Sequence, residues 1–464
     1  MIQSIRYLPM VAIAMAIVLR AAPSLAMCGG MFPLDERPRP PDPRDLVAQR
    51  ILNKASKVAL FREGELTVLT MSNDVITDVD EFGLVVPVPT VIKEKDVRIS
   101  DPALFAALEQ LTNPKLVETW DPEPCPDRMA MAQAEATAKV ASAPSPPSAG
   151  GGLRAADYGV KVEAHYDVGE YSIAVLGAQQ GRGAGLVEWL NKFHYAVPQE
   201  AIPVLNSYIG QNMKFFVAKV NFRKLKGKGA TFLRPIQVRY TTPRFMLPVR
   251  LGTINADGPQ ELVAWAVSAK GRIEATNYRT ARMPTGHDLP LYVKDQLEKV
   301  YAAIFDQETR KADMRVIFTE FVQRGGLDGT TAEKLGVSWG RAPESDVSYL
   351  TLSRLHFRYD RDHFPEDLVL QETADIEPYA VSYAVKHPAT RVDCPEGATY
   401  LASLGPRREN EAGNLASLTG WDAKEIREKM GLGPMVPPRP STPTPQAPAP
   451  PPKKSFWQRL FSDE

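Results

Sequence analysis

Three residues with metal-binding side chains recur at two-residue spacing before the middle of the chain. Glu163, His165 and Asp167 occupy alternate positions of a predicted strand, so they are expected on one face of it. Carboxylate and imidazole groups arranged in this way can bind Zn²⁺ or Ca²⁺. The apolar residues of the same strand should face the other way, and these are Val160, Val162, Ala164, Tyr166 and Val168. A half-exposed strand shows the same alternation without a metal, so both interpretations stay open.

A second candidate metal site lies in the densest run of titratable groups in the chain. Asp360, Asp362 and His363 offer two carboxylates and one imidazole within four residues, which could bind Ca²⁺ or Zn²⁺. Arg358 and Arg361 are close enough in sequence to pair with these carboxylates first. The alternative is therefore the end of a strand followed by a salt-bridged loop.

Gly336, Ser338 and Gly340 form the G-x-S-x-G pattern of serine hydrolases. That motif needs a strand before the serine and a helix after it, which together expose the hydroxyl and support the oxyanion. Residues 331–335 instead predict a helix before the motif, with Gly336 at its C-terminal end, and residues 341–343 begin a loop. This context favours a turn over a catalytic serine.

A glycine-rich segment at 177–185 lies between a predicted strand and a predicted helix, where backbone N–H groups can hold a phosphate. The segment lacks the Lys-Ser/Thr pair of a P-loop, and no following strand places an acidic residue to bind a ribose. A flexible turn is the better interpretation.

The C-terminal end of the chain has the design of a docking peptide. A proline-dense stretch at 434–452 is followed by Phe456, Trp457, Leu460 and Phe461, which cluster on one helical face beside basic residues. Such a short helix is marginal alone and would form on binding. We expect it to dock on an envelope protein or a membrane surface, and a disordered terminus is the alternative.

The elements that must position these residues do not alternate regularly between strand and helix. Strands are predicted at 57–61, 66–71, 82–89, 158–168, 171–176, 215–220, 236–240, 246–251 and 262–267. Helices are predicted from 102 to 111, around 186–190, and at 198–209, 295–305, 314–321 and 421–430. The prolines of 82–89 favour an edge position for that strand. The pattern indicates an α+β fold with largely antiparallel sheets and interspersed helices.

Shifts in composition divide the chain into five parts. These are a signal peptide at 1–26, an N-terminal α+β segment at 27–120, a disordered Ala/Pro/Gly-rich linker at 121–153, a main α+β domain at 154–432 and a proline-rich tail at 433–464.

Charge and hydropathy exclude two classes of protein. The 464 residues hold 55 basic and 55 acidic side chains without a basic stripe, which argues against nucleic-acid binding. After the signal peptide no stretch approaches about 20 uncharged apolar residues, so no transmembrane helix is predicted in the mature chain.

The first residues predict export. Arg6 precedes a short apolar run, and Ser24 and Ala26 place small residues where signal peptidase reads, so the mature chain should begin at Met27 in the periplasm or outside the cell. Membrane association through lipidated Cys28 stays open, although Met27 stands where the lipidation signal prefers a small residue.

An oxidising compartment favours a disulfide between two of the three cysteines. We favour Cys28 with Cys125 because both flank the same N-terminal segment, which would leave Cys394 unpaired. Three cysteines without a C-x-x-C spacing do not indicate a structural zinc site.

From Cys28 to about Glu372 the chain resembles the exported bacterial proteins grouped as domain of unknown function 2330. The matching stretches are 28–30, 82–89, 104–125, 175–208, 246–251, 255–258, 277–280 and 352–370. The resemblance implies an envelope or secreted protein and implies no reaction, so no catalytic residue is transferred from it.

These observations predict an exported, non-enzymatic protein that binds an envelope partner, with no cofactor. The alternative is a metal-dependent hydrolase acting on an envelope polymer, with Ca²⁺ or Zn²⁺ at one of the two candidate clusters.

Overall fold

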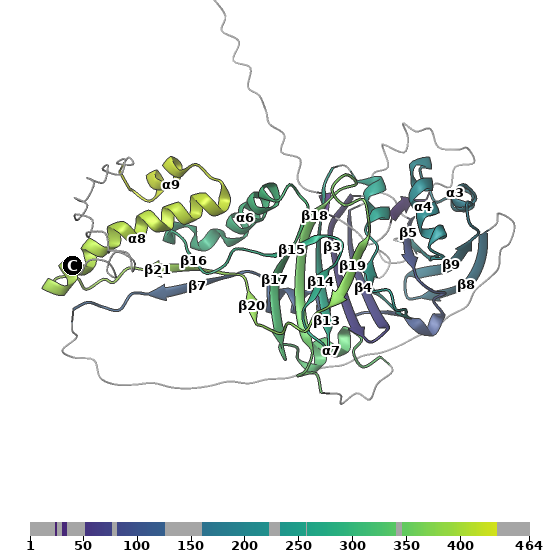
Figure 1. The fold of residues 1–464 in the computed structure, drawn as a ribbon, viewed down its shortest axis with the longest axis horizontal. Helices are drawn as coiled ribbons and strands as arrows, with labels where there is room; N and C mark the ends of the chain where they lie inside the picture. The colour runs from purple at the N-terminus through teal and green to yellow at the C-terminus, as the bar shows by residue number, and fades with distance from the viewer. Residues whose placement is uncertain are drawn as a thin grey trace, which may run out of the picture.

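The computed structural model describes residues 24–25, 30–34, 52–76, 81–125, 160–221, 233–256, 258–339 and 346–433. Two sheets stand next to each other toward one end of the molecule, and a lobe of helices lies at the other end (Figure 1). The sheets are mostly antiparallel and helices are interspersed along the chain, so the predicted α+β class is confirmed.

The larger sheet has the strand order β15-β17-β18-β13-β3-β4-β11-β6, with β1 and β20 pairing at its side. Its strands are β1 (Ser24–Leu25), β3 (Leu52–Glu63), β4 (Leu66–Ile76), β6 (Val97–Ile99), β11 (Ile236–Thr241), β13 (Gln260–Ser268), β15 (Arg279–Arg282), β17 (Val316–Arg324), β18 (Thr351–Tyr359) and β20 (Tyr379–Ala380). The strands predicted at 57–61 and 66–71 are present as the hairpin of β3 and β4, and Gly64 in its turn has φ 56°. The centre of the sheet joins distant segments, because β13 pairs parallel to β3 and antiparallel to β18.

The second sheet is antiparallel, with the order β2-β5-β10-β9-β8. Its strands are β2 (Gly30–Pro33), β5 (Glu81–Val88), β8 (Val160–Val168), β9 (Tyr171–Ala178) and β10 (Lys214–Asn221). One face packs on the larger sheet, and α3 (Gly183–Lys192), η2 (Gln199–Ala201) and α4 (Ile202–Gly210) cover the other. The edge position predicted for β5 is correct only near its prolines. Strand β5 lies between β2 and β10, but β2 ends opposite Val85. Pro87 therefore has a neighbouring strand on one side only.

The helical lobe contains η4 (Leu291–Gln296), α6 (Leu297–Lys311), α8 (Pro395–Thr419) and α9 (Ala423–Lys429). These helices share a core with the small parallel sheet of β16 (His287–Asp288), β21 (Ser382–His387) and β7 (Lys115–Trp120). The remaining elements are η1 (Glu94–Asp96), α2 (Ala103–Thr112), β12 (Met246–Leu247), η3 (Arg250–Asn255), β14 (Ile273–Ala275), α7 (Gly329–Lys334) and β19 (Leu368–Glu372). Among the described residues, no helix combines the length and the apolar character needed to cross a membrane.

Three elements differ from the sequence prediction. The segment predicted as a helix at 314–321 is strand β17, whose aromatic and β-branched residues pair with β18 along the buried sheet. A short apolar run of this kind does not distinguish a strand from a helix by its period. The strand predicted at 246–251 ends at Leu247 and continues as η3, and the long helix α8 was not predicted.

Segments assigned to separate parts by composition share both sheets. Strands β3 and β4 pair with β13 and β11, and β5 pairs with β10. Of the parts predicted from composition, residues 1–23 and 26 of the signal peptide, residues 126–153 of the linker at 121–153, and residues 434–464 of the tail lie outside the described residues.

The disulfide prediction is wrong. Cys125 bonds to Cys394, with a Cα–Cα distance of 5.9 Å, and Cys28 lies outside the described residues. The parallel pairing of β7 with β21 explains this choice, because Trp120 lies opposite His387 and both chains continue from there toward the two cysteines. Adjacency in space, which the cysteine spacing does not reveal, decided the pairing.

We predict that a non-reducing peptide map of the oxidised protein contains one peptide pair joining Cys125 to Cys394. The pairing of β7 with β21 should form only this bridge, and tandem mass spectrometry of the linked peptides tests it. A linked pair containing Cys28 and Cys125 would contradict the arrangement of the helical lobe. Cys394→Ser should remove the linked pair without creating another.

Candidate functional site: a charge-lined pocket beneath helix α6

Strand β18 presents three cationic side chains on one face. Arg354, His356 and Arg358 alternate with Leu355 and other apolar residues, because successive side chains of a strand point to opposite faces. The apolar set packs between the two sheets, whereas the cationic set turns toward α6. Arg354 and His356 are buried and Arg358 is partly buried. Buried cations require partners, since an unpaired charge in the interior is costly.

Those partners are carboxylates from three different elements. Glu320 comes from β17, Glu261 from β13 and Asp306 from α6. Glu320 is fully buried and is the extra residue of a β-bulge, because the β17–β18 register shifts between Thr319 and Phe321. A bulge redirects a side chain, and here it brings the Glu320 carboxylate onto the cationic face of β18.

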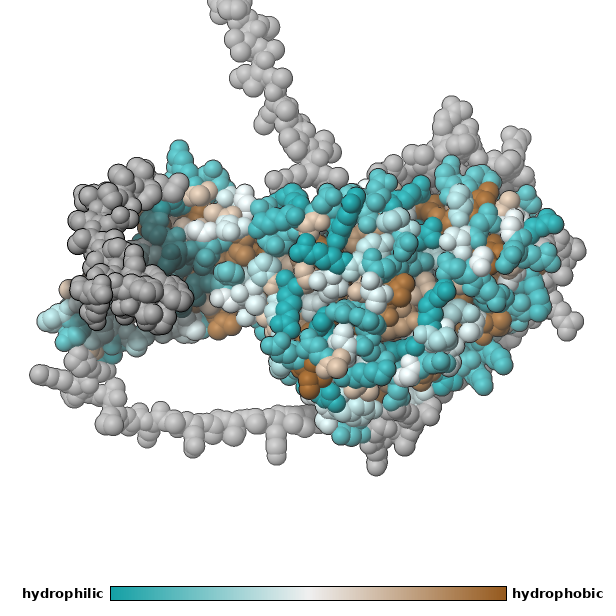
Figure 2. All heavy atoms as spheres, viewed as in Figure 1, coloured by the Kyte–Doolittle hydropathy of each residue, from teal (hydrophilic) through white to brown (hydrophobic). Residues whose placement is uncertain are grey.

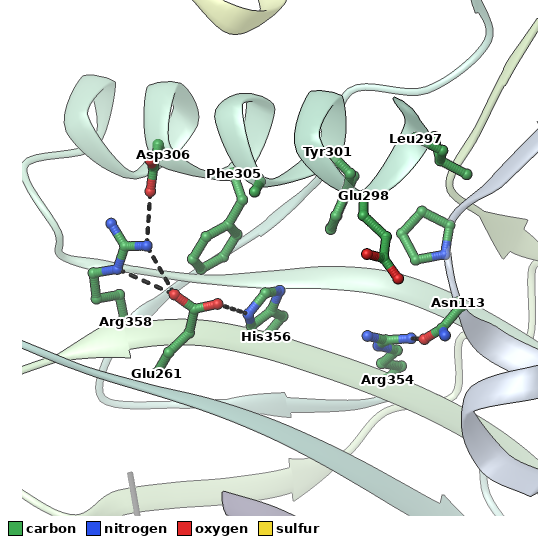
Figure 3. A pocket seen from close by; sticks show the side chains of 12 residues that line it. Asn113, Glu261, Leu297, Glu298, Tyr301, Phe305, Asp306, Arg354, His356 and Arg358 are labelled. Carbon is green, nitrogen blue, oxygen red and sulfur yellow. Dashed lines mark hydrogen bonds and ion pairs between the residues drawn. The ribbon is translucent and has the colours of Figure 1, made fainter. Parts of the chain in front are cut away.

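His356 lies between two of these carboxylates, and Figure 3 shows its contact with one of them, Glu261. Its Nδ1 is 2.6 Å from Glu320 Oε1 and its Nε2 is 3.0 Å from Glu261 Oε1. The imidazole also stacks on the Phe305 ring, with centroids 3.8 Å apart. Both ring nitrogens can donate to an anion only in the imidazolium form, so the geometry fits a positively charged His356.

The electrostatics agree with this assignment. Burial opposes the charged form of His356, but Glu320 and Glu261 outweigh it and raise the pKa of His356 to about 9. Burial likewise opposes ionised Glu261, yet His356 and Arg358 lower the pKa of Glu261 to about 2. Glu320 follows the same pattern, because its cationic neighbours hold its pKa below the ordinary value despite complete burial.

The two arginines are fixed at opposite ends of this row. Arg358 donates to Glu261 Oε2 at 2.8 Å and forms an ion pair with Asp306 Oδ1 at 2.7 Å. Arg354 Nε lies 2.8 Å from Glu320 Oε2 as an ion pair outside hydrogen-bond geometry. Three cations therefore meet three anions, and the network is neutral when His356 is protonated.

Arg354 also connects the network to its surroundings. Its Nη1 donates to Asn113 Oδ1 in the turn after α2, and its guanidinium lies 5.5 Å from the centre of the Trp265 ring. Tyr301 of α6 donates its hydroxyl to Glu320, and burial followed by the Glu320 charge keeps the pKa of Tyr301 well above its ordinary value. The phenol therefore stays protonated.

The network forms one wall of a pocket of about 380 Å³. The opposite wall is one face of α6, with Leu297, Glu298, Tyr301, Ala302, Phe305 and Asp306, and the turn at Asn113 and Pro114 closes one end. Figure 3 shows α6 lying across the strands with these side chains between them. Hydrophilic residues dominate the face of the molecule seen in Figure 2, where hydrophobic residues form small separate groups. The candidate site is thus a recess with charged and apolar walls.

The polar groups at the centre of the lining are bound to one another. Among the described residues that line the pocket there is no serine, threonine, cysteine or lysine. His356 has no ring nitrogen left to accept a proton, because each nitrogen faces a carboxylate. The Tyr301 hydroxyl is engaged with Glu320. The polar groups of this wall hold each other in place and present a fixed charged surface.

The residues of the first predicted metal cluster do not share one face. Strand β8 has a bulge between Val162 and Ala164, which reverses the alternation that the sequence predicted. Val162 and Val160 pack against the α3–α4 side, whereas Ala164, Tyr166 and Val168 pack between the sheets. Glu163 pairs with Lys161 at 2.6 Å. His165 and Asp167 lie opposite Ala174 and Ser172, on the face that Val162 occupies before the bulge.

The second predicted cluster closes a turn. Asp360 Oδ1 accepts hydrogen bonds from the backbone N–H groups of Asp362 and His363, at 2.9 Å each, and lies 2.8 Å from His363 Nδ1. Strand β18 ends at Tyr359, so the predicted strand end is present, although Arg358 pairs with Glu261 and Asp306. Within the described ranges, no group of three or more His, Cys, Asp or Glu side chains is arranged to hold a metal ion.

Neither of the two sequence motifs has the geometry of a site. Ser338 follows helix α7 and Gly336, whose φ is 87°, so a helix precedes the serine as predicted. In the glycine-rich segment, the N–H of Gly183 at the start of α3 already donates to Asn206 Oδ1 at 2.8 Å. The docking residues Phe456, Trp457, Leu460 and Phe461 lie outside the described residues.

Sequence reasoning missed the pocket, although the sequence carries one signal of it that was not used. The spacing Arg354-x-His356-x-Arg358 within an apolar strand predicts one cationic face, and buried cations need acidic partners. The partners could not be found, since Glu320 fell in a segment predicted as a helix. Glu261 lies directly before the strand predicted at 262–267 and inside the observed strand β13, and nothing in the sequence indicates which strand it faces.

Together, the fold and the site define an α+β protein with two packed sheets and a charge-lined pocket beneath a helix. The chain belongs to the family domain of unknown function 2330 (DUF2330), described as an uncharacterized protein conserved in bacteria, which matches residues 23–371. The matched range includes every residue lining the pocket. The resemblance read from the sequence is confirmed.

Other comparisons add no functional information. No curated protein matches the chain. The crystal structure of baculovirus P35 is similar at 11% identity, covering 49% of this chain and 68% of that one with a TM-score of 0.24. A TM-score this low supports no argument on fold or function.

We predict a pH dependence of stability that comes from His356. The fold raises the pKa of His356 from 6.5 to about 9. The contribution of His356 to the free energy of unfolding is therefore complete below pH 6.5, the pKa in the unfolded chain, and is lost as the pH rises through about 9. Between about pH 6 and about pH 9.5 the free energy of unfolding should fall by roughly 3 kcal/mol more in the unsubstituted protein than in the His356→Gln variant. Urea unfolding at both pH values measures the difference.

His287→Gln is the matched control, because His287 lies on β16 away from the pocket. It should retain the pH dependence of the unsubstituted protein. Equal slopes for His356→Gln and the unsubstituted protein would contradict a charged, carboxylate-bound His356. At the acid end, Glu261 makes the opposite contribution, which is lost as the pH falls through about 2.

Proposed function

We propose that this protein is an exported bacterial binding protein that holds a small ligand in the pocket between α6 and strands β13 and β18. The observation that carries this proposal is the saturated network on one wall, where each charged group of β18 has a carboxylate partner. Such a wall is rigid and pre-organised, which reduces the cost of ordering a site when a ligand binds. The volume of about 380 Å³ suits a small molecule or a few atoms of a larger one.

The described lining lacks a serine, threonine, cysteine or lysine, and the histidine and carboxylate at its centre are bound to each other, which favours binding over hydrolysis. A hydrolase would need a free base next to a nucleophile or an activated water, whereas the carboxylate of Glu298, which is free within the described residues, lies at one end of the pocket, away from this centre. His356 and Glu261 bind each other, and Arg358 occupies the second oxygen of Glu261. We infer that the protein binds this ligand in the bacterial envelope. The C-terminal docking peptide would hold the protein there.

Export supplies a separate prediction. The protein recovered from the bacterium that makes it should begin at Met27 and should fractionate outside the cytoplasm, because Ser24 and Ala26 define a cleavage site. N-terminal sequencing and intact mass measure this. A modified N-terminus at Cys28 would instead show lipidation, and an intact Met1 in the cytoplasm would contradict export.

Filling the pocket tests the binding proposal. Ala302 is an exposed residue of α6 that lines the pocket, so Ala302→Trp should occupy the recess without disturbing the buried network. Ligand-observed NMR with a defined fragment library should reveal fragments that bind the full chain and lose at least about tenfold in affinity with Ala302→Trp.

Ala402→Trp is the matched control, because Ala402 is an exposed alanine of α8 outside the pocket lining. It should bind the same fragments as the unsubstituted chain. If every fragment that binds is indifferent to Ala302→Trp, the pocket is not the binding site and the proposed function fails.

A further inference from the structure

One end of the pocket has polar groups that the protein itself does not use. This inference rests on the proposed function and concerns the chemical class of the ligand. At the Asp306 end, Arg358 is bound by both Glu261 and Asp306. At the other end, near the turn after α2, an acceptor and several donors face the same space (Figure 3).

The acceptor is the carboxylate of Glu298. It lies in the first turn of α6, and within the part of the chain that the structure describes no hydrogen bond or ion pair reaches it. Figure 3 shows its side chain directed from α6 toward Asn113 and Arg354. Since the network on the opposite wall is neutral with His356 protonated, Glu298 adds an uncompensated negative charge to the α6 side of the pocket.

The donors lie opposite. Arg354 uses Nε for Glu320 and Nη1 for Asn113, which leaves Nη2 without a protein partner among the described residues. Asn113 accepts from Arg354 through Oδ1, so its Nδ2 group likewise has no partner in the described ranges. A ligand atom that accepts from these two groups is a carbonyl or carboxylate oxygen.

The space between acceptor and donors has apolar walls. Leu297 and Tyr301 of α6 line one side and Pro114 the other, and Leu297 is only half-buried. A small aliphatic group next to the polar head of a ligand would cover them, and each buried CH₂ group contributes favourably to binding.

We propose that this end of the pocket binds an α-aminoacyl group with an aliphatic side chain, as in an amino-acid amide or the N-terminus of a peptide. The ammonium group pairs with Glu298, the adjacent carbonyl accepts from Arg354 and Asn113, and the side chain lies against Leu297. The ammonium group neutralises the charge of the Glu298 carboxylate, and the neighbouring carbonyl oxygen accepts hydrogen bonds from Arg354 Nη2 and Asn113 Nδ2. Neither an acid without an amine nor a simple alkylamine satisfies both.

Isothermal titration calorimetry with leucinamide, 4-methylpentanamide and 4-methylpentanoate on the full chain tests the class. Leucinamide should bind at least about tenfold more tightly than 4-methylpentanamide, which lacks the amine, and 4-methylpentanoate should bind more weakly still. Leucyl-glycyl-glycine distinguishes the two sources of the group. Affinity equal to or above that of leucinamide indicates a peptide N-terminus, and markedly weaker binding indicates a free amino-acid derivative.

Glu298→Gln identifies the group that recognises the amine. It should weaken leucinamide binding about tenfold and leave 4-methylpentanamide unchanged, because only the former has a cation. Glu425→Gln, in the first turn of α9 and exposed outside the pocket, is the matched control and should change neither affinity. Equal loss of both probes in Glu298→Gln, or no loss, would overturn the proposal.

Failure of the ligand class and failure of the proposed function give different results. If 4-methylpentanoate binds more tightly than leucinamide and Ala302→Trp abolishes that binding, the pocket is a binding site for another class and the aminoacyl proposal is wrong. If no probe or fragment responds to Ala302→Trp, both proposals fail.

Discussion

The buried contact of His356 with Glu320 and Glu261 is the interaction on which the rest of the site depends. Glu320 comes from β17, His356 from β18 and Glu261 from β13, so one imidazole joins three adjacent strands of the larger sheet. Its ring also supports Phe305, through which α6 is seated above the sheet. Removing one member of a buried charge network leaves its partners uncompensated, at a typical cost of 3–5 kcal/mol. The pocket keeps its shape because these groups cannot move independently.

The same constraint supports the proposal that the pocket serves recognition. Arg358 and His356 both form ion pairs with carboxylates. The groups at the centre of the wall and at its Asp306 end are therefore already paired within the protein. Unused capacity remains where the network ends, at Asn113 and Glu298 on two different elements. A ligand that bridges them would join α6 to the turn between α2 and β7.

The sequence was sufficient for the fold class and for local features. The hairpin of β3 and β4, the start of α2 and the turn at Gly336 follow from residue types and periodicity. What it could not reveal depends on distant partners. Two β-bulges redirect side chains without a sequence signal, one separating Glu163 from the face of His165 and the other placing Glu320 beside His356. The disulfide to Cys394 depends in the same way on the parallel pairing of β7 with β21.

The protonation state of His356 tests the central claim most directly. In the full chain, ¹⁵N chemical shifts of the imidazole at neutral pH should show both ring nitrogens protonated, and this state should persist until the pH approaches about 9. Strongly downfield N–H protons on both nitrogens would place the ring between two carboxylates. A His356 that is neutral at pH 7, or that titrates near the ordinary histidine value of 6.5, would contradict the network and with it the account of the pocket.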